Sequence, residues 1–167
     1  MLAFIAHADP KEDCSNEFGL AGAADGSYQS GNFAAALHFY SLLKGCGYDY
    51  GFIGIGRLYE DGAGVTLDYK AAAENYSVAA RNGHPYAALL LARMYATGKG
   101  VLQNFVTAHI LANLAAKDGY GSDIAEEGSE LVQALSEKMV PTQIARAQEA
   151  ATSCKQKNKF TYKNCGF

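Results

Sequence analysis

The sequence predicts an all-α fold: a right-handed α-solenoid of stacked antiparallel helix pairs, with capping helices at its C-terminal end. Three observations lead to this prediction. The chain repeats itself, apolar residues recur at helical spacing within each copy, and glycines recur where each copy turns. Such internal repetition is typical of solenoids, whose small units bury their apolar faces only by stacking on one another.

The repeat is clearest in residues 48–83 and 84–119, which align without a gap at a shift of 36 residues (84 − 48). The matching positions include residues of the expected turns as well as apolar residues of the expected helices. They are Tyr50/Tyr86, Arg57/Arg93, Tyr59/Tyr95, Gly62/Gly98, Gly64/Gly100, Val65/Val101, Tyr69/Phe105 and Ala72/Ala108. Because the turn residues repeat together with the apolar pattern, each copy is predicted to be one structural unit.

Each unit is expected to contain two helices. In the first helix, over residues 51–59, apolar positions fall at i, i+4, i+7 and i+8, which is one helical face. Gly62 stands where this helix is expected to end in a left-handed residue. Asp68 is the expected N-cap of a second helix, which begins at Tyr69 and ends at residues 82–83.

The first helix of the unit at residues 48–83 contains Gly51, Gly54 and Gly56, and each glycine destabilises a helix by about 1 kcal/mol relative to alanine. Close approach of a neighbouring helix is the expected compensation. The next unit has alanines at the first and third of these positions but Leu90 at the second. We therefore expect tight packing at the first and third positions and a looser requirement at the second.

This pattern of a small-apolar helix, a Gly-x-Gly-Val turn, an aromatic residue and an Ala-rich helix resembles the Sel1-like repeat, a relative of the tetratricopeptide repeat. The segments that carry the resemblance are Leu58-Tyr59, Gly62-Ala63-Gly64-Val65 and Ala79-Ala80, then Met94-Tyr95, Gly98-Lys99-Gly100-Val101 and Ala115-Ala116. The resemblance implies an α-solenoid that commonly acts as an adaptor. It also implies that some exported members neutralise a toxin or engage envelope or host proteins.

We expect a single repeat domain over residues 14–155. Its first unit is a shortened copy in which residues 29–32 replace the Gly-x-Gly-Val turn. The expected order is an N-terminal extension at 1–13, units at 18–47, 48–83 and 84–119, capping helices within 120–155 (at 123–138 and 141–155) and a basic tail at 156–167.

Residues 1–5 are apolar, and the following Ala6-His7-Ala8 has the small-x-small form that signal peptidase cleaves. Two interpretations stay open. The segment is the stump of a secretion signal whose beginning is missing, which we favour, or it is an apolar N-terminus that packs on the first helix. The favoured interpretation places the protein in the periplasm or outside a bacterial cell. No stretch approaches the roughly 18 apolar residues of a membrane-spanning helix, so none is expected.

The four cysteines allow three pairings. Cys154 and Cys165 are close in sequence, and a disulfide between them would tie the tail to the last helix. Cys14 and Cys46 would then remain, at positions that antiparallel packing of the first two helices could bring together. A metal site is the weaker alternative, because no CxxC motif occurs and the histidines are dispersed. An even number of cysteines agrees with an oxidising compartment.

The sequence offers little that predicts catalysis. No Walker, HExxH, GxSxG or EF-hand motif occurs, and His38 and His109 are interpreted as partly buried, hydrogen-bonded helix residues. A net charge of −3 and a pI near 5.8 disfavour binding to nucleic acid. We therefore predict a protein that is not an enzyme and uses no cofactor. The alternative, which comes from the resemblance, is the binding or hydrolysis of β-lactams that has been linked to a cysteine-rich branch of Sel1-like proteins.

The remaining function is recognition of another protein or peptide, by a chain that we expect to be monomeric. Solenoids expose a concave face whose side chains recur with the repeat. The side chains of the first helices that the core pattern leaves free, and that we predict to bind the partner, are Tyr50, Ile53, Arg57, Tyr86, Leu89, Leu90 and Arg93. Tyrosine and arginine often dominate binding energies. The alternative is that Tyr50 and Tyr86 merely pack between units.

Overall fold

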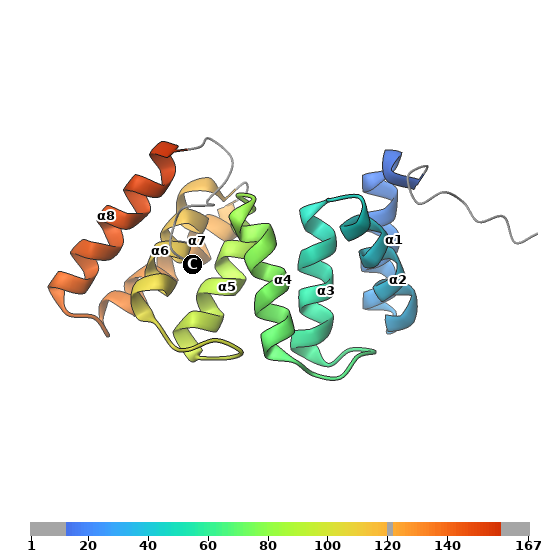
Figure 1. Cartoon of the computed structure of the whole chain (residues 1–167), viewed down its shortest axis with the longest axis horizontal. Helices are drawn as coiled ribbons and strands as arrows, with labels where there is room; N and C mark the ends of the chain where they lie inside the picture. The colour runs from blue at the N-terminus through green and yellow to red at the C-terminus, as the bar shows by residue number, and fades with distance from the viewer. Residues whose placement is uncertain (1–12, 120–121, 158–167) are drawn as a thin grey trace, which may run out of the picture.

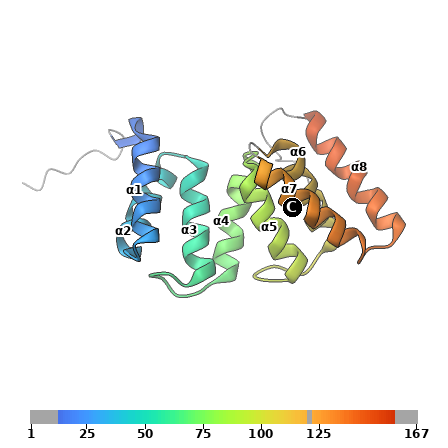
Figure 2. The same ribbon diagram turned by 180° about the vertical axis from the view of Figure 1, so that it is seen from behind.

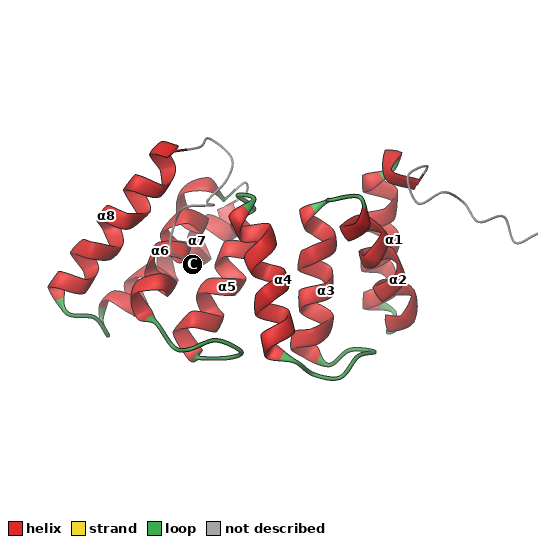
Figure 3. Ribbon diagram, viewed as in Figure 1, coloured by secondary structure: helices red, strands yellow, loops and turns green. Residues whose placement is uncertain are grey.

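The structure of the protein is a computed structural model that describes residues 13–119 and 122–157. Within these residues the chain forms eight α-helices and one short 3-10 helix, and no strand (Figure 3). The helices are arranged along the long axis of the molecule, with α1 and α2 at one end and α8 at the other (Figure 1), and the view from behind shows the same order (Figure 2). The all-α stack predicted from the sequence is confirmed.

Consecutive helices form the antiparallel pairs that the repeat predicts, because each helix from α1 to α6 packs on the next one along the chain. The last helix departs from this order, since α8 packs mainly on α6. The helices are α1 (Glu17–Gln29), α2 (Phe33–Gly45), α3 (Asp49–Asp61), α4 (Tyr69–Arg81), α5 (Pro85–Thr97), α6 (Phe105–Asp118), α7 (Ser122–Ser136) and α8 (Pro141–Lys157), preceded by the 3-10 helix η1 (Asp13–Ser15).

The second helix of each pair begins at the same place in the repeat. Its N-cap is Asn32 in α2, Asp68 in α4 and Asn104 in α6, at steps of 36 residues (68 − 32 and 104 − 68). Each cap side chain accepts a hydrogen bond from a backbone N–H in the first turn, which satisfies one of the donors left unpaired at a helix start. The predicted cap at Asp68 is confirmed, and its two counterparts follow from the same period.

The Gly-x-Gly turns fix the spacing between units. The first helices α3 and α5 end at Gly62 and Gly98, which take the left-handed conformation as predicted. The second glycine of each turn lies against the preceding unit. A Cβ on Gly100 would lie 2.1 Å from the carbonyl oxygen of Tyr69, the first residue of α4. Only glycine therefore fits this contact at its present separation.

Helix α3 approaches α2 closely enough that a side chain would clash. A Cβ on Gly51 would lie 2.2 Å from the backbone nitrogen of Lys44, and one on Gly54 would lie 2.1 Å from the ring of Tyr40. The expected looser requirement at Gly54 is therefore wrong. The corresponding tyrosine of the next unit, Tyr76, packs against Gly56 instead, which fits with leucine replacing glycine at the position equivalent to Gly54.

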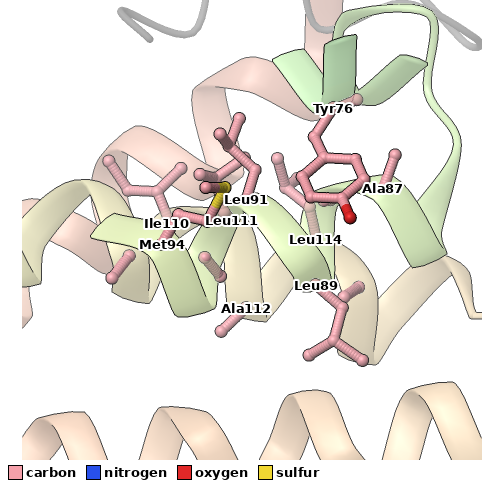
Figure 4. Close-up of a cluster of buried hydrophobic side chains, with 14 of the residues drawn as sticks. Tyr76, Ala87, Leu89, Leu91, Met94, Ile110, Leu111, Ala112 and Leu114 are labelled. Atoms are coloured by element: carbon pink, nitrogen blue, oxygen red, sulfur yellow. The ribbon is translucent and has the colours of Figure 1, made fainter. Parts of the chain in front are cut away.

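The buried side chains form two clusters that meet at α3. One joins α1, α2 and α3 around Tyr40 and Leu43. The other runs from α3 to α8, and its centre contains Tyr76, Leu91 and Leu111 (Figure 4). An inner helix such as α3 therefore buries side chains on two sides. None of the described helices is both long enough and apolar enough to cross a bilayer.

A disulfide ties the start of the described chain to the end of the first helix pair. Cys14 in η1 is bonded to Cys46, the residue after α2, with 5.5 Å between their Cα atoms. The hydroxyl of Tyr48 also donates a hydrogen bond to the carbonyl oxygen of Cys14, at 2.7 Å. The structure thus has the predicted Cys14–Cys46 pair. Cys154 is buried near the end of α8, and its predicted partner Cys165 lies outside the described residues.

Replacing Gly100 with alanine should lower the free energy of unfolding by about 2 kcal/mol, because the new Cβ meets the Tyr69 carbonyl and the left-handed conformation disfavours a side chain. The matched control is Gly26→Ala on α1, where a Cβ would have no neighbour within 4 Å. That change should stabilise by up to about 1 kcal/mol. Chemical denaturation measures both. Equal midpoints for Gly100→Ala and the wild type would show that the units are not held at this contact.

Replacing both Cys14 and Cys46 with serine should lower the free energy of unfolding by about 3–4 kcal/mol, the chain-entropy value for a loop of this length. The two residues are separated by 32 positions. Denaturation of the double variant measures the loss, and mass spectrometry of the unreduced wild type should recover the two cysteines in one linked peptide pair. A peptide linking Cys46 to Cys154 would contradict the pairing.

Candidate functional site

The first helices of successive pairs touch one another through polar and aromatic side chains. Arg57 of α3 lies over the ring of Tyr28 of α1, with 4.6 Å between the guanidinium carbon and the ring centroid. Arg93 of α5 forms an ion pair with Glu127 of α7. These contacts join α1 to α3 and α5 to α7. We call the surface that α1, α3, α5 and α7 form in this way the first-helix surface.

Asp25 of α1 is held between two tyrosines of the following helices. One carboxylate oxygen accepts a hydrogen bond from the hydroxyl of Tyr40 at 2.7 Å, and the other accepts one from Tyr50. Burial and these hydrogen bonds raise the pKa of Tyr50 to about 12 and also raise the pKa of Tyr40. Both phenols are therefore donors at neutral pH, and both oxygens of Asp25 are engaged.

Two further carboxylates accept hydrogen bonds from tyrosines. Tyr28 of α1 donates to Asp61 at the end of α3, and Tyr76 of α4 donates to Glu60 at 2.7 Å. The pKa of both tyrosines is raised, first by burial and second by the hydrogen bond to the carboxylate. The carboxylates of Asp61 and Glu60, like that of Asp25, are thus held in position by neutral phenol donors.

Arg57 lies at the centre of these tyrosines. Burial opposes its charge, whereas the phenol groups around it, those of Tyr86 and Tyr28 first, raise its pKa. Its side chain is partly exposed. Among the residues that the structure describes, Arg57 has no carboxylate within ion-pair distance. A charged, planar donor group therefore reaches this surface without an anionic partner from the part of the chain that is described.

Most of the predicted partner-binding residues have exposed area. Arg93 is exposed, and those that are partly exposed are Tyr50, Arg57, Tyr86 and Leu90. The expectation that Ile53 and Leu89 are free of the core is wrong, because their exposed fractions are 3% and 0% (Figure 4 shows Leu89 among the core side chains). The physical reason is that α3 and α5 each pack against helices on two sides, so they bury a wider arc than one apolar stripe.

Sequence reasoning missed Asp25, Tyr28 and Glu127. A signal for the first of these was present in the sequence. Helices α1 and α3 have the same length and start 32 residues apart (49 − 17), and this shift places Asp25 on Arg57 (57 − 25). Because the first unit has a shorter turn, α1 precedes α3 by 32 residues rather than 36. An alignment at a shift of 36 therefore does not match the residues of α1 to those of α3.

Polar side chains also gather at two other places in the fold. A cavity of ≈ 340 Å³ is lined by Asp49, Asn82 and His84, among others. There Asn82 donates to Asp49 at 2.6 Å, and the Nδ1 atom of His84 is buried without a hydrogen-bond partner. That nitrogen has almost no solvent-accessible surface in this structure. His109 is buried beside Asn113 and Ser136 as expected, whereas His38 is exposed, contrary to expectation. No cluster of three or more potential metal ligands occurs among the described residues.

The comparisons with known proteins agree with this architecture. The Sel1 repeat model matches residues 48–84 and 85–120. Among solved structures, c5321, described as a protective antigen of uropathogenic Escherichia coli strains with an SLR fold, has a TM-score of 0.75 at 19% identity, over 84% of this chain and 30% of its own length. A Sel1 repeat protein from Oxalobacter formigenes has a TM-score of 0.57 at 27% identity, over 71% of this chain and 89% of its own. No curated protein sequence matches the chain. This chain spans less than a third of the length of c5321, so that likeness concerns the fold.

Replacing Asp25 with alanine should lower the free energy of unfolding by about 1–3 kcal/mol, because the hydroxyl of Tyr40 would lose its acceptor in a site where that side chain is only 1% exposed. The control is the same change in a Tyr40→Phe background, where the Tyr40 hydroxyl is absent and only that of Tyr50 loses its acceptor. Denaturation of the four proteins gives the coupling energy. Additive effects would show that the hydrogen bond adds nothing to stability.

Proposed function

We propose that this chain, which contains two Sel1 repeats at residues 48–84 and 85–120, is a noncatalytic interaction module whose protein partner binds the first-helix surface. Sel1 repeats commonly mediate protein–protein interactions. The observation that carries the proposal is the array of tyrosines and arginines that crosses this surface from α1 to α5.

The chemistry of the surface suits protein recognition. Tyrosine and arginine are enriched among residues that dominate binding energies. Here the phenols of Tyr28 and Tyr50 are already fixed by hydrogen bonds to carboxylates. Side chains that are ordered before binding lose little conformational freedom when a partner arrives, which favours affinity. The surface is therefore largely preorganised for a partner.

The proposed module acts outside the cytoplasm, in the periplasm or secreted from a bacterial cell. Support comes from the disulfide between Cys14 and Cys46, a bond that persists in oxidising compartments, and from the signal-like residues 1–8. An envelope or host protein is one class of partner within this proposal. A toxin that the protein neutralises is the other class of partner within this proposal.

The proposal is tested by capturing partners from the native envelope fraction with a cross-linker, and then measuring the affinity of the purified partner by calorimetry. Tyr86→Ala, on the first-helix surface, should weaken binding by about tenfold or more. The matched control is Val78→Ala on the second helix α4, where the side chain is 36% exposed. This change should leave the affinity unaltered. Both variants must keep the melting temperature of the wild type within a few degrees.

Two outcomes would contradict the proposal. Loss of binding in Val78→Ala, with full binding in Tyr86→Ala, would place the interface on the second helices. Steady hydrolysis of a chromogenic β-lactam by the purified wild type, abolished by a single substitution, would favour the enzyme alternative.

A further inference from the structure

Arg57 and Arg93 occupy the same position in successive units, 36 residues apart (93 − 57), yet the structure gives them different surroundings. Arg93 is neutralised by Glu127, which the next first helix, α7, supplies. The next first helix after Arg57 is α5, whose sequence from Pro85 to Thr97 contains no aspartate or glutamate. Helix α5, which follows Arg57, therefore has no counterpart of Glu127.

The carboxylates on the other side of Arg57 are engaged elsewhere. Both oxygens of Asp25 accept hydrogen bonds from tyrosines, and Asp61 accepts one from Tyr28. The guanidinium of Arg57 lies over the ring of Tyr28, with 4.6 Å between the guanidinium carbon and the ring centroid. A guanidinium donates hydrogen bonds through the N–H groups along its edge, in the geometry that a carboxylate accepts. Within the residues that the structure describes, Arg57 therefore lacks the anion that its counterpart Arg93 already has.

We propose that Arg57 is the recognition point for an acidic side chain, a glutamate or aspartate, of the protein partner, and that Arg93 is not. The inference rests on the proposed function and narrows it to one chemical class of partner. The internal precedent favours a side chain over a chain terminus, because the group that fills the equivalent position at Arg93 is the side chain of Glu127. Tyr86 and Tyr50 flank the position and supply apolar ring area to the partner segment.

The test uses blocked peptides as probes on the intact protein, so it does not depend on knowing the partner. The probes are Ac-Gly-Tyr-Glu-Gly-NH2, the same peptide with Gln or Lys in place of Glu, and the Gln peptide with a free C-terminus. Arginine side-chain N–H signals are followed by nitrogen-15 NMR, and the Arg57→Lys spectrum assigns the Arg57 signal. The Glu peptide should shift that signal and bind about fivefold more tightly than the Gln peptide.

The two arginines provide matched variants. In Arg57→Gln the preference for Glu over Gln should disappear, and in Arg93→Gln it should persist, with both proteins keeping the wild-type melting temperature. Equal binding of the Glu and Gln peptides to the wild type would overturn the inference. Preference for the Lys peptide would assign the surface to cationic partners, and preference for the free C-terminus would assign it to a chain end. Each of these results leaves the proposed function standing if Tyr86→Ala still loses the captured partner.

Discussion

The stack depends on contact between the second glycine of each turn and the start of the second helix in the preceding unit. Gly64 lies against Phe33, and Gly100 lies against Tyr69, at equivalent places 36 residues apart (100 − 64). The absence of a side chain lets the turn rest directly on the neighbouring helix. This contact sets the distance between units, and every contact that the first helices make across unit boundaries requires that distance.

That constraint explains why the fold could be predicted from the sequence. A contact this close leaves no room for a side chain and strongly favours glycine, so it leaves a repeated signal in the chain. The left-handed ends at Gly62 and Gly98 and the cap at Asp68 are signals of the same kind, since each follows from local backbone geometry. Local rules of this sort operate identically in every unit, and a period in the sequence therefore becomes a period in space.

The candidate site was predicted less completely, because it depends on relations between helices. An isoleucine can lie on an exposed helix face or against a second helix, so the identity of Ile53 does not reveal its burial. The pattern of residues within one helix does not show that α3 is packed on two sides. Gly54 is crowded by the ring of Tyr40, which comes from another helix. The hydrogen bonds of Tyr40 and Tyr50 to Asp25 were not predicted, because the shorter first turn shifts α1 out of the 36-residue register of the other units.

The difference between Arg57 and Arg93 shows how a repeated sequence acquires chemistry that does not repeat. The end of a solenoid needs a polar outer helix, because no further unit covers it. Helix α7 meets this need in part with acidic side chains, among them Glu126, Glu127 and Glu130, and one of them neutralises Arg93. Helix α5 lies inside the stack and carries no acidic side chain. Arg57, the equivalent arginine one unit earlier, therefore has no carboxylate partner on the first helix that follows it. Because the end of the stack is polar, Arg93 is paired within the fold. Arg57, at the centre of the first-helix surface, stays available to a partner.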